Sequence, residues 1–194
     1  MSDEANIWAG LNPPYRTIVA DPPWDHSDAK GTALRDGKWV PAGGLPYSSM
    51  GLDQIKALPV DALAGRDAHL YLWTTNRYLR DSFAVAEAWG FVPVRPLVWC
   101  KSPRAPFIGG PFGGASIEFC LFARKGHLRP IGRAGRQWWQ WPRGAHSAKP
   151  AAFGDVVESV SPGPYVELFA RQPRLGWDAW GHGYETRDVY RRPA

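Results

Sequence analysis

The chain has 194 residues, of which 44% are hydrophobic, so one compact domain over residues 1–194 is expected and a disordered polymer is excluded. Its two cysteines, Cys100 and Cys120, lie in apolar stretches and are too few for a disulfide framework or a zinc site. The net charge of +5 permits a nucleic-acid partner, while an acidic start and the lack of a membrane-length apolar run predict a cytoplasmic protein without membrane contact.

The first part of the chain predicts a strand followed by a long loop. Residues 1–14 are expected to form an amino-terminal extension. Residues 16–20 are a β-branched run that ends at two prolines, which predicts a strand that stops there. Residues 25–46 are rich in glycine and predict a long loop, a kind of segment that often serves as a lid or binding loop.

Strand and helix patterns alternate along the rest of the chain. Residues 69–73 are a near-continuous apolar run, as in a strand covered on both faces. An apolar stripe at helical spacing follows between Asn76 and Gly90, with the members Leu79, Phe83, Ala86 and Trp89. The other expected helices are 52–58 and 150–159, and the other expected strands are 92–100, 117–123 and 165–170. This alternation predicts an α/β fold with a largely parallel sheet and helices on both faces.

Two charged residues directly follow predicted strands. Ligands of such folds bind beyond the carboxyl ends of the strands. Asp21 and Arg171 occupy those positions, and they are therefore the first candidates for chemistry.

A basic segment rich in tryptophan occupies residues 124–149. It contains seven Lys or Arg residues and no Asp or Glu, together with Trp138, Trp139 and Trp141. Cations that meet phosphates and aromatic rings that stack on bases would suit an unpaired nucleotide strand. A solvated basic loop whose tryptophans pack on the core is the other reading, and the sequence leaves both open.

Asp21-Pro22-Pro23-Trp24 is the most specific motif in the chain. A weakly nucleophilic amine can be oriented by a carboxylate that accepts one of its hydrogens and a backbone carbonyl that accepts the other. Successive prolines fix the backbone and leave carbonyl acceptors in a rigid turn, and an adjacent aromatic ring can stack on a base. The alternative is a proline-stopped strand with a capping Asp and a core Trp.

This motif and a series of others resemble the MT-A70 family of adenine N6-methyltransferases. The resemblance extends from about residue 15 to residue 183. The further motifs are, in order, Leu45-Pro46-Tyr47 with Met50, Leu70-Tyr71-Leu72-Trp73-Thr74, Trp99 with Lys101, Glu118 before Cys120-Leu121, Ser147-Ala148-Lys149-Pro150, Glu167-Leu168-Phe169-Ala170-Arg171, Gly176-Trp177 and Trp180-Gly181. The resemblance implies a single Rossmann-like methyltransferase domain that is permuted, with the catalytic strand first and the cofactor strand late.

The resemblance also implies roles around the target base. The implied catalytic residues are Asp21, Pro22, Pro23 and Trp24. The implied substrate-binding residues are Tyr47, Glu118 and Lys149. Asp21 and Pro22 would hold the amine, Trp24 would support the base, and Lys149 would lie where substrate and cofactor meet.

The implied methyl donor is S-adenosylmethionine, and no metal ion is expected. The residues implied to bind the donor are Asp21, Lys149, Glu167, Leu168, Phe169, Arg171 and His182. Phe169 would lie against it and Arg171 would reach its ribose, although a structural ion pair is the other reading of Arg171. His182 and Gly183 depart from the family, which usually has Asn followed by Glu or Gln there.

The expected partner is a nucleic acid, and a dimer is possible. DNA is favoured over RNA because the chain is small and resembles stand-alone bacterial or phage members of the family. The alternative function is a catalytically degenerate, nucleic-acid-binding subunit. The intact Asp21-Pro22-Pro23-Trp24 argues against that alternative, and the altered His182-Gly183 keeps it open.

Overall fold

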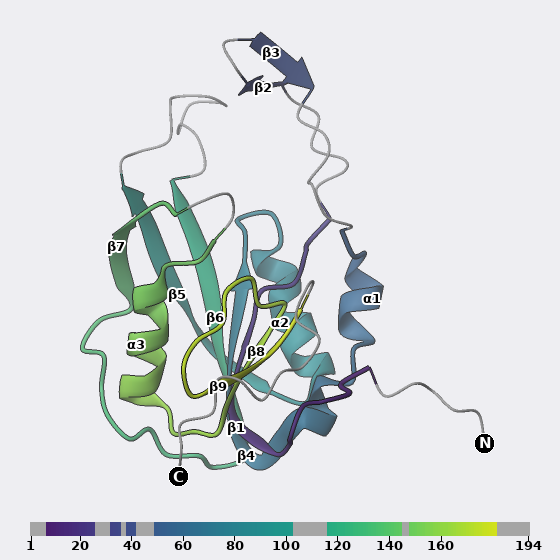
Figure 1. Cartoon of the computed structure of the whole chain (residues 1–194), viewed down its shortest axis with the longest axis vertical. Coiled ribbons are helices and arrows are strands. Elements are labelled where there is room, and N and C mark those ends of the chain that lie inside the picture. Colours follow the sequence, from purple (N-terminus) through teal and green to yellow (C-terminus); the bar gives the residue numbers. More distant parts are fainter. Residues whose placement is uncertain are drawn as a thin grey trace, which may run out of the picture.

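The computed structural model describes residues 7–25, 32–35, 38–41, 49–102, 116–144 and 148–181. Seven strands form one sheet in the order β7-β5-β6-β4-β1-β8-β9 (Figure 1). Their bounds are Tyr15–Ala20 for β1, Ala64–Thr74 for β4, Val92–Ser102 for β5, Ile117–Lys125 for β6, Trp138–Pro142 for β7, Tyr165–Leu168 for β8 and Trp177–Trp180 for β9. A separate hairpin of β2 (Thr32–Arg35) and β3 (Lys38–Pro41) lies inside the segment that was predicted to be a loop.

The sheet is mixed. β6 runs antiparallel to both of its neighbours, β4 and β5, whereas every other pair of neighbouring strands is parallel. The predicted parallel arrangement is thus correct for six strands and wrong for β6. The carboxyl ends of those six strands and the amino end of β6 share one edge of the sheet, which we call the carboxyl edge.

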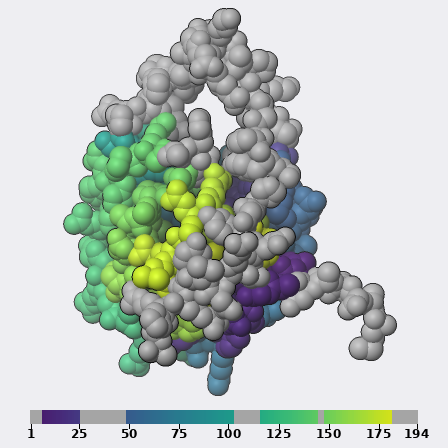
Figure 2. Space-filling view, in the orientation of Figure 1, coloured from purple at the N-terminus to yellow at the C-terminus, as the bar shows by residue number. Residues whose placement is uncertain are grey.

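Helices cover both faces, as predicted. The helices are α1 (Leu52–Lys56), α2 (Leu79–Ala88) and α3 (Ala151–Val160), with a 3₁₀ turn at Val60–Leu63. Alternate residues of β1 point to opposite faces, so Ile18 packs with α1 and α2 while Val19 packs with α3. The same alternation in β4 explains why the strand reads as a continuous apolar run. In the space-filling view, residues beyond 160 fill the middle of the face between the green 116–160 segment and the purple amino-terminal residues (Figure 2).

The helix expected between Asn76 and Gly90 forms, but it is shorter than the prediction. It begins at Leu79 without a side-chain cap, and the backbone reverses at Gly90, where φ is +79°. Of the predicted apolar stripe, Ala86 and Trp89 are buried, whereas Phe83 is 38% exposed, and Ser82 and Val85 complete the inward face.

Trp8, within the predicted amino-terminal extension, packs on the core. Its ring is 5% exposed, meets the ring of Trp180 edge to face, and donates from Nε1 to the carbonyl of Pro59 at 3.1 Å. Cys120 is buried and Cys100 is half-buried, and both are free thiols. Within the described ranges, no helix is both long and apolar enough to cross a membrane.

Candidate functional site

The carboxyl edge brings together charged residues from four segments. Asp21 directly follows β1, and Arg171 lies just beyond β8. Lys149 precedes α3, and Glu118 is the second residue of β6, whose amino end reaches this edge because the strand is antiparallel. The amide of Asp21 donates to the carbonyl of Leu168 at 3.3 Å, which fixes the end of β1 against the end of β8.

Lys149 is the centre of this cluster. Its Nζ donates to both carboxylate oxygens of Asp21, at 2.7 and 2.8 Å, and lies 3.4 Å from Oε2 of Glu118. The ammonium also lies 5.4 Å from the centre of the Trp73 ring. A cation at the start of a helix opposes the helix dipole, so Lys149 is held here by its carboxylates and not by α3.

The cluster extends to both sides as a row of alternating charges. Lys101, at the end of β5, places Nζ 2.5 Å from Oε1 of Glu118. On the other side Arg171 places a guanidinium nitrogen 3.9 Å from Oδ2 of Asp21. The row therefore alternates in sign from Lys101 to Arg171, and each carboxylate lies between two cations.

The charges of the cluster stabilise one another against burial. Burial alone would lower the pKa of Lys149, but the carboxylates of Asp21 and Glu118 outweigh it and raise the pKa. Burial alone would raise the pKa of Glu118, but Lys149 and Lys101 outweigh it and lower the pKa. Lys149 and Glu118 therefore both stay ionised near neutral pH.

Glu167, the third residue of β8, behaves in the opposite way. Burial, followed by the repulsion of the Asp21 carboxylate, raises its pKa to about 7. Glu167 pairs in register with Val19, whose side chain lies on the α3 face. The edge thus holds a carboxyl group whose pKa lies near neutral pH beside one that is paired with Lys149.

The turn at residues 21–24 is held from both sides. The Pro22 carbonyl accepts from the Trp24 amide at 2.8 Å, and the Pro23 carbonyl accepts from the Met50 amide at 2.8 Å. The Trp24 ring is 4% exposed, donates from Nε1 to the carbonyl of Trp73 at 2.9 Å, and stacks on Tyr78 with ring centres 5.1 Å apart.

The structure bears on the alternative reading of this motif, which holds for the core Trp and fails for the capping Asp. Trp24 is a core residue that braces the turn, and its ring face is already covered by Tyr78. Asp21 does not cap the turn, because its carboxylate forms an ion pair with Lys149 and lies 3.9 Å from Arg171.

The end of β8 adopts an unusual backbone. Phe169 has φ +63°, a left-handed conformation that bulky residues rarely adopt outside functional sites. Its ring meets Trp180 edge to face at 5.4 Å. The side chain of Leu168 is buried in the core on the α1 and α2 face. At Gly181 a Cβ would lie 2.6 Å from the carbonyl oxygen of Ala170, so only glycine lets these segments approach so closely.

Two hydroxyl groups at the end of β4 are buried and lack partners among the described residues. They belong to Thr74 and Thr75, and β4 is the parallel neighbour of β1. A buried hydroxyl group without a hydrogen bond lowers the stability of the fold, so buried hydroxyl groups are expected to have a partner. A polar ligand at the carboxyl edge would supply it. Nowhere in the described ranges do three metal-binding side chains gather as a metal ion would need.

The structure brings together most of the site residues predicted from sequence. Asp21, Glu118, Lys149, Glu167 and Arg171 meet at one edge. Tyr47, His182 and Gly183 lie outside the described residues.

The sequence reasoning gave no role to Lys101, Thr74, Thr75 or Tyr78. Lys101 and Thr74 were in motifs that matched the family, which was the available signal. Nothing in the sequence marked Tyr78, which supports Trp24 from the next element.

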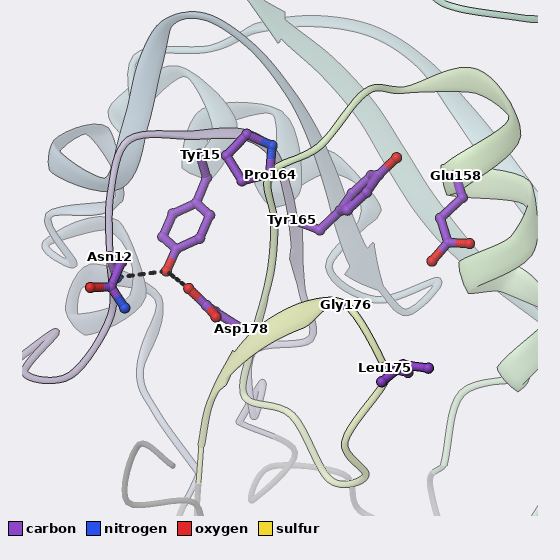
Figure 3. Close-up of a pocket in the computed structure, with 8 residues that line it drawn as sticks. All are labelled: Asn12, Tyr15, Glu158, Pro164, Tyr165, Leu175, Gly176 and Asp178. Atoms are coloured by element: carbon purple, nitrogen blue, oxygen red, sulfur yellow. Dashed lines mark hydrogen bonds between the residues drawn. The ribbon is translucent and has the colours of Figure 1, made fainter. Parts of the chain in front are cut away.

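A different hollow of about 420 Å³ lies at the opposite edge of the sheet (Figure 3). Tyr15 and Asp178, which line it, occupy the starts of β1 and β9, and the Tyr15 hydroxyl donates to the Asp178 carboxylate. It is therefore separated from Asp21 by the full length of β1 and does not belong to the charged cluster.

Comparison with known proteins gives a consistent result. Residues 15–183 match the MT-A70 family. The chain is 33% identical over 181 residues to the type II methyltransferase M.MunI of Mycoplasma sp, covering 86% of this chain and 76% of M.MunI. It is 28% identical to mouse N(6)-adenine-specific methyltransferase METTL4, covering 87% of this chain and 37% of METTL4. It is 29% identical to a Drosophila melanogaster N(6)-adenosine-methyltransferase MT-A70-like protein, covering 81% of this chain and 24% of that protein.

Proposed function

Because the chain belongs to the MT-A70 family, we propose that it is an enzyme that methylates the exocyclic N6 amine of adenine in a nucleic acid, with S-adenosylmethionine as the donor. The observation that carries the proposal is the bidentate contact of Lys149 with Asp21 at the end of β1. This contact orients the carboxylate of the family's motif next to the end of β8. A degenerate subunit would have no need to keep this pair.

Asp21 and Pro22 are the residues that hold the target amine. A carboxylate accepts hydrogen bonds only, so Asp21 accepts one amine hydrogen. The Pro22 carbonyl already accepts from Trp24 and has one lone pair left, which accepts the other hydrogen. With both hydrogens fixed, the nitrogen lone pair points out of the turn, and orientation of this kind accounts for much of enzymatic rate enhancement.

Trp24 acts by bracing this turn. Its ring is covered by Tyr78 and tied to Trp73, so it fixes the position of Pro22 without stacking on the base itself. Glu118, which faces the same edge between two lysines, is the candidate for contacts with the rest of the adenine ring.

The residues at the carboxyl edge fit S-adenosylmethionine. Its cationic amino group suits Glu167, and its cationic sulfonium suits Asp21. Its anionic carboxylate suits Lys149. Arg171 and the buried Thr74 and Thr75 hydroxyls offer partners for the hydroxyl groups of the ligand. When bound, the donor supplies an electrophilic methyl group: the N–C bond forms as the C–S bond breaks, and the amine releases one proton to solvent.

The strand order supports a permuted arrangement of the domain. β1, which leads into the catalytic turn, comes first in the chain, and β8, which we assign to the cofactor, comes late, although the two are neighbours in the sheet. We place DNA before RNA as the substrate. The chain spans three quarters of a type II methyltransferase but only about a quarter of a relative named as an adenosine methyltransferase.

A methyl-transfer assay tests the function. The full chain is incubated with S-adenosylmethionine labelled in its methyl group and with matched DNA and RNA oligonucleotides that do or do not contain adenine. The proposal predicts label in adenine-containing DNA above the level in RNA, and none in oligonucleotides without adenine. Titration calorimetry with S-adenosylmethionine is run beside it, because a degenerate subunit would neither bind the donor nor transfer label.

A further inference from the structure

The edge strand β7 exposes an aromatic surface. Among the described residues, β7 pairs with β5 alone, and the two faces of β7 differ. Trp139 and Trp141 stack with ring centres 5.5 Å apart, and Trp141 packs toward the α3 core. Trp138 lies on the other face and is 54% exposed. The reading in which the tryptophans pack on the core therefore holds for Trp141, and Trp138 is the ring whose position the core does not explain.

Two arginines without an acidic partner in the described part of the chain precede this ring in the sequence. Residues 124–144 contain six Lys or Arg residues and no Asp or Glu. Lys125 pairs with Asp61, whereas Arg133 and Arg136 are exposed and have no carboxylate within ion-pair distance in the described part of the chain. Arg136 lies two residues before Trp138. An exposed aromatic ring beside unpaired guanidinium groups suits a polyanion with stacking bases.

A partner protein strand fits this edge less well. Edge strands that pair with other chains present an uninterrupted row of backbone donors and acceptors. β7 ends at Pro142, which has no N–H, and it is only five residues long. Basic residues and proline on an edge strand are also common means of preventing such pairing.

The surface also lies at a suitable distance from the catalytic turn. Four steps across the sheet separate β7 from β1, or about 19 Å at the usual spacing of strands. Trp138 pairs in register with Val98, Val98 with Phe119, and Phe119 with Thr74, so Trp138 lies within one residue of the level of Asp21 along the strands. The distance from Trp138 to Asp21 is then roughly 19 Å, or about six base steps of stacked nucleic acid.

From these observations, and resting on the proposed function, we propose that Trp138, Arg133 and Arg136 bind the flank of the substrate nucleic acid about six nucleotides from the target adenine. Trp138 stacks on a base, and the two arginines contact phosphates. The surface adds affinity and orients the strand, and it makes no contact with the reacting atoms.

Binding of labelled single-stranded DNA tests this assignment. One pool has about 25 nucleotides with a central adenine and random flanks, and a second pool has about six nucleotides. Affinities for wild type, Trp138→Ala and the double variant Arg133→Ala with Arg136→Ala are measured by fluorescence anisotropy at several salt concentrations. The control double variant, Arg66→Ala with Arg80→Ala, removes two exposed arginines from β4 and α2.

Trp138→Ala should weaken binding of the long pool by about 5- to 150-fold and leave binding of the short pool unchanged. The Arg133 and Arg136 variant should reduce the slope of log affinity against log salt by about 1.4, at about 0.7 per phosphate contact. The assignment is overturned if both variants bind the long pool as tightly as the control does, or if they change the oligomeric state instead. Methyl transfer by wild type is measured on the same pools, so a failure of the flank site with intact methylation is distinguished from a failure of the proposed function.

Discussion

Replacing Glu167 with Gln should stabilise the folded protein above pH 7 and weaken binding of the methyl donor. Burial and the Asp21 carboxylate raise the pKa of Glu167 from an ordinary value of 4.5 to about 7. Because the folded pKa is the higher one, ionisation of Glu167 reduces stability as the pH rises from about 4.5 to 7, and the loss is complete above pH 7. The size of the shift corresponds to about 3 kcal/mol.

The assay is urea unfolding of wild type and Glu167→Gln between pH 5 and pH 9. The variant should gain up to about 3 kcal/mol over wild type at pH 8 and little at pH 5. Glu87→Gln on the exposed side of α2 is the control and should stay within about 0.5 kcal/mol at every pH. A variant whose stability follows that of wild type at all pH values would refute the reasoning.

The same substitution shows whether the Glu167 carboxylate binds the donor or is only destabilised by its burial. A cationic donor next to Glu167 favours the ionised carboxylate, so binding near pH 7 should release part of a proton from wild type and none from Glu167→Gln. Calorimetry in buffers of different ionisation enthalpy measures this release. Equal proton release by both proteins would remove Glu167 from the proposed donor site.

Three further substitutions give distinct results. Lys149→Met should destabilise the protein by about 3–5 kcal/mol, because the ammonium that offsets the buried Asp21 carboxylate is lost, and thermal melts should show a smaller loss at pH 5 than at pH 8. Thr74→Val removes a buried hydroxyl that has no partner among the described residues, so urea unfolding should show unchanged stability or a gain of about 1 kcal/mol. Calorimetry should show weaker binding of the donor, and a clear loss of stability would mean that the hydroxyl has a hydrogen-bond partner without a ligand. Trp24→Phe loses the hydrogen bond to Trp73 and should lower stability by about 1–2 kcal/mol. Its methyl-transfer rate should fall while KM for the donor stays unchanged. A fall in donor affinity as large as the fall in rate would contradict a role confined to the turn.

The order of β1, β4, β5, β6, β8 and the three helices was predictable because periodicity and turn residues are local signals, whereas β2, β3, β7 and β9 were not predicted. The direction of strands and the buried face of helices were harder to predict. Phe83 has the same helical spacing as the buried Ala86 and Trp89, yet it is exposed and the small residue Ser82 is buried, because α2 lies close against α1 and the sheet. β6 reads like any buried strand, and its antiparallel direction follows from the connection to β5, which periodicity does not encode.

The candidate site could also be predicted from the sequence only in part. The motif at Asp21 and the position of Lys149 were evident from sequence, but the row of alternating charges was not. It depends on β6 running against its neighbours, which brings Glu118 to the edge between Lys101 and Lys149. A tryptophan next to a proline turn was consistent with a base platform and with a core brace. Only the position of Tyr78 distinguishes the two.

The position of the transferred methyl group tests the central claim most directly. Substrate treated with wild type, Asp21→Ala or the surface control Asp61→Ala is digested to nucleosides and analysed by mass spectrometry, with binding of S-adenosylmethionine measured on each protein. We expect N6-methylated adenine from wild type and the control, and none from Asp21→Ala even when the donor is raised to saturation, because loss of the carboxylate beside the sulfonium weakens donor binding without abolishing it. A methyl group on any other atom, or wild-type methylation by Asp21→Ala, would contradict the account.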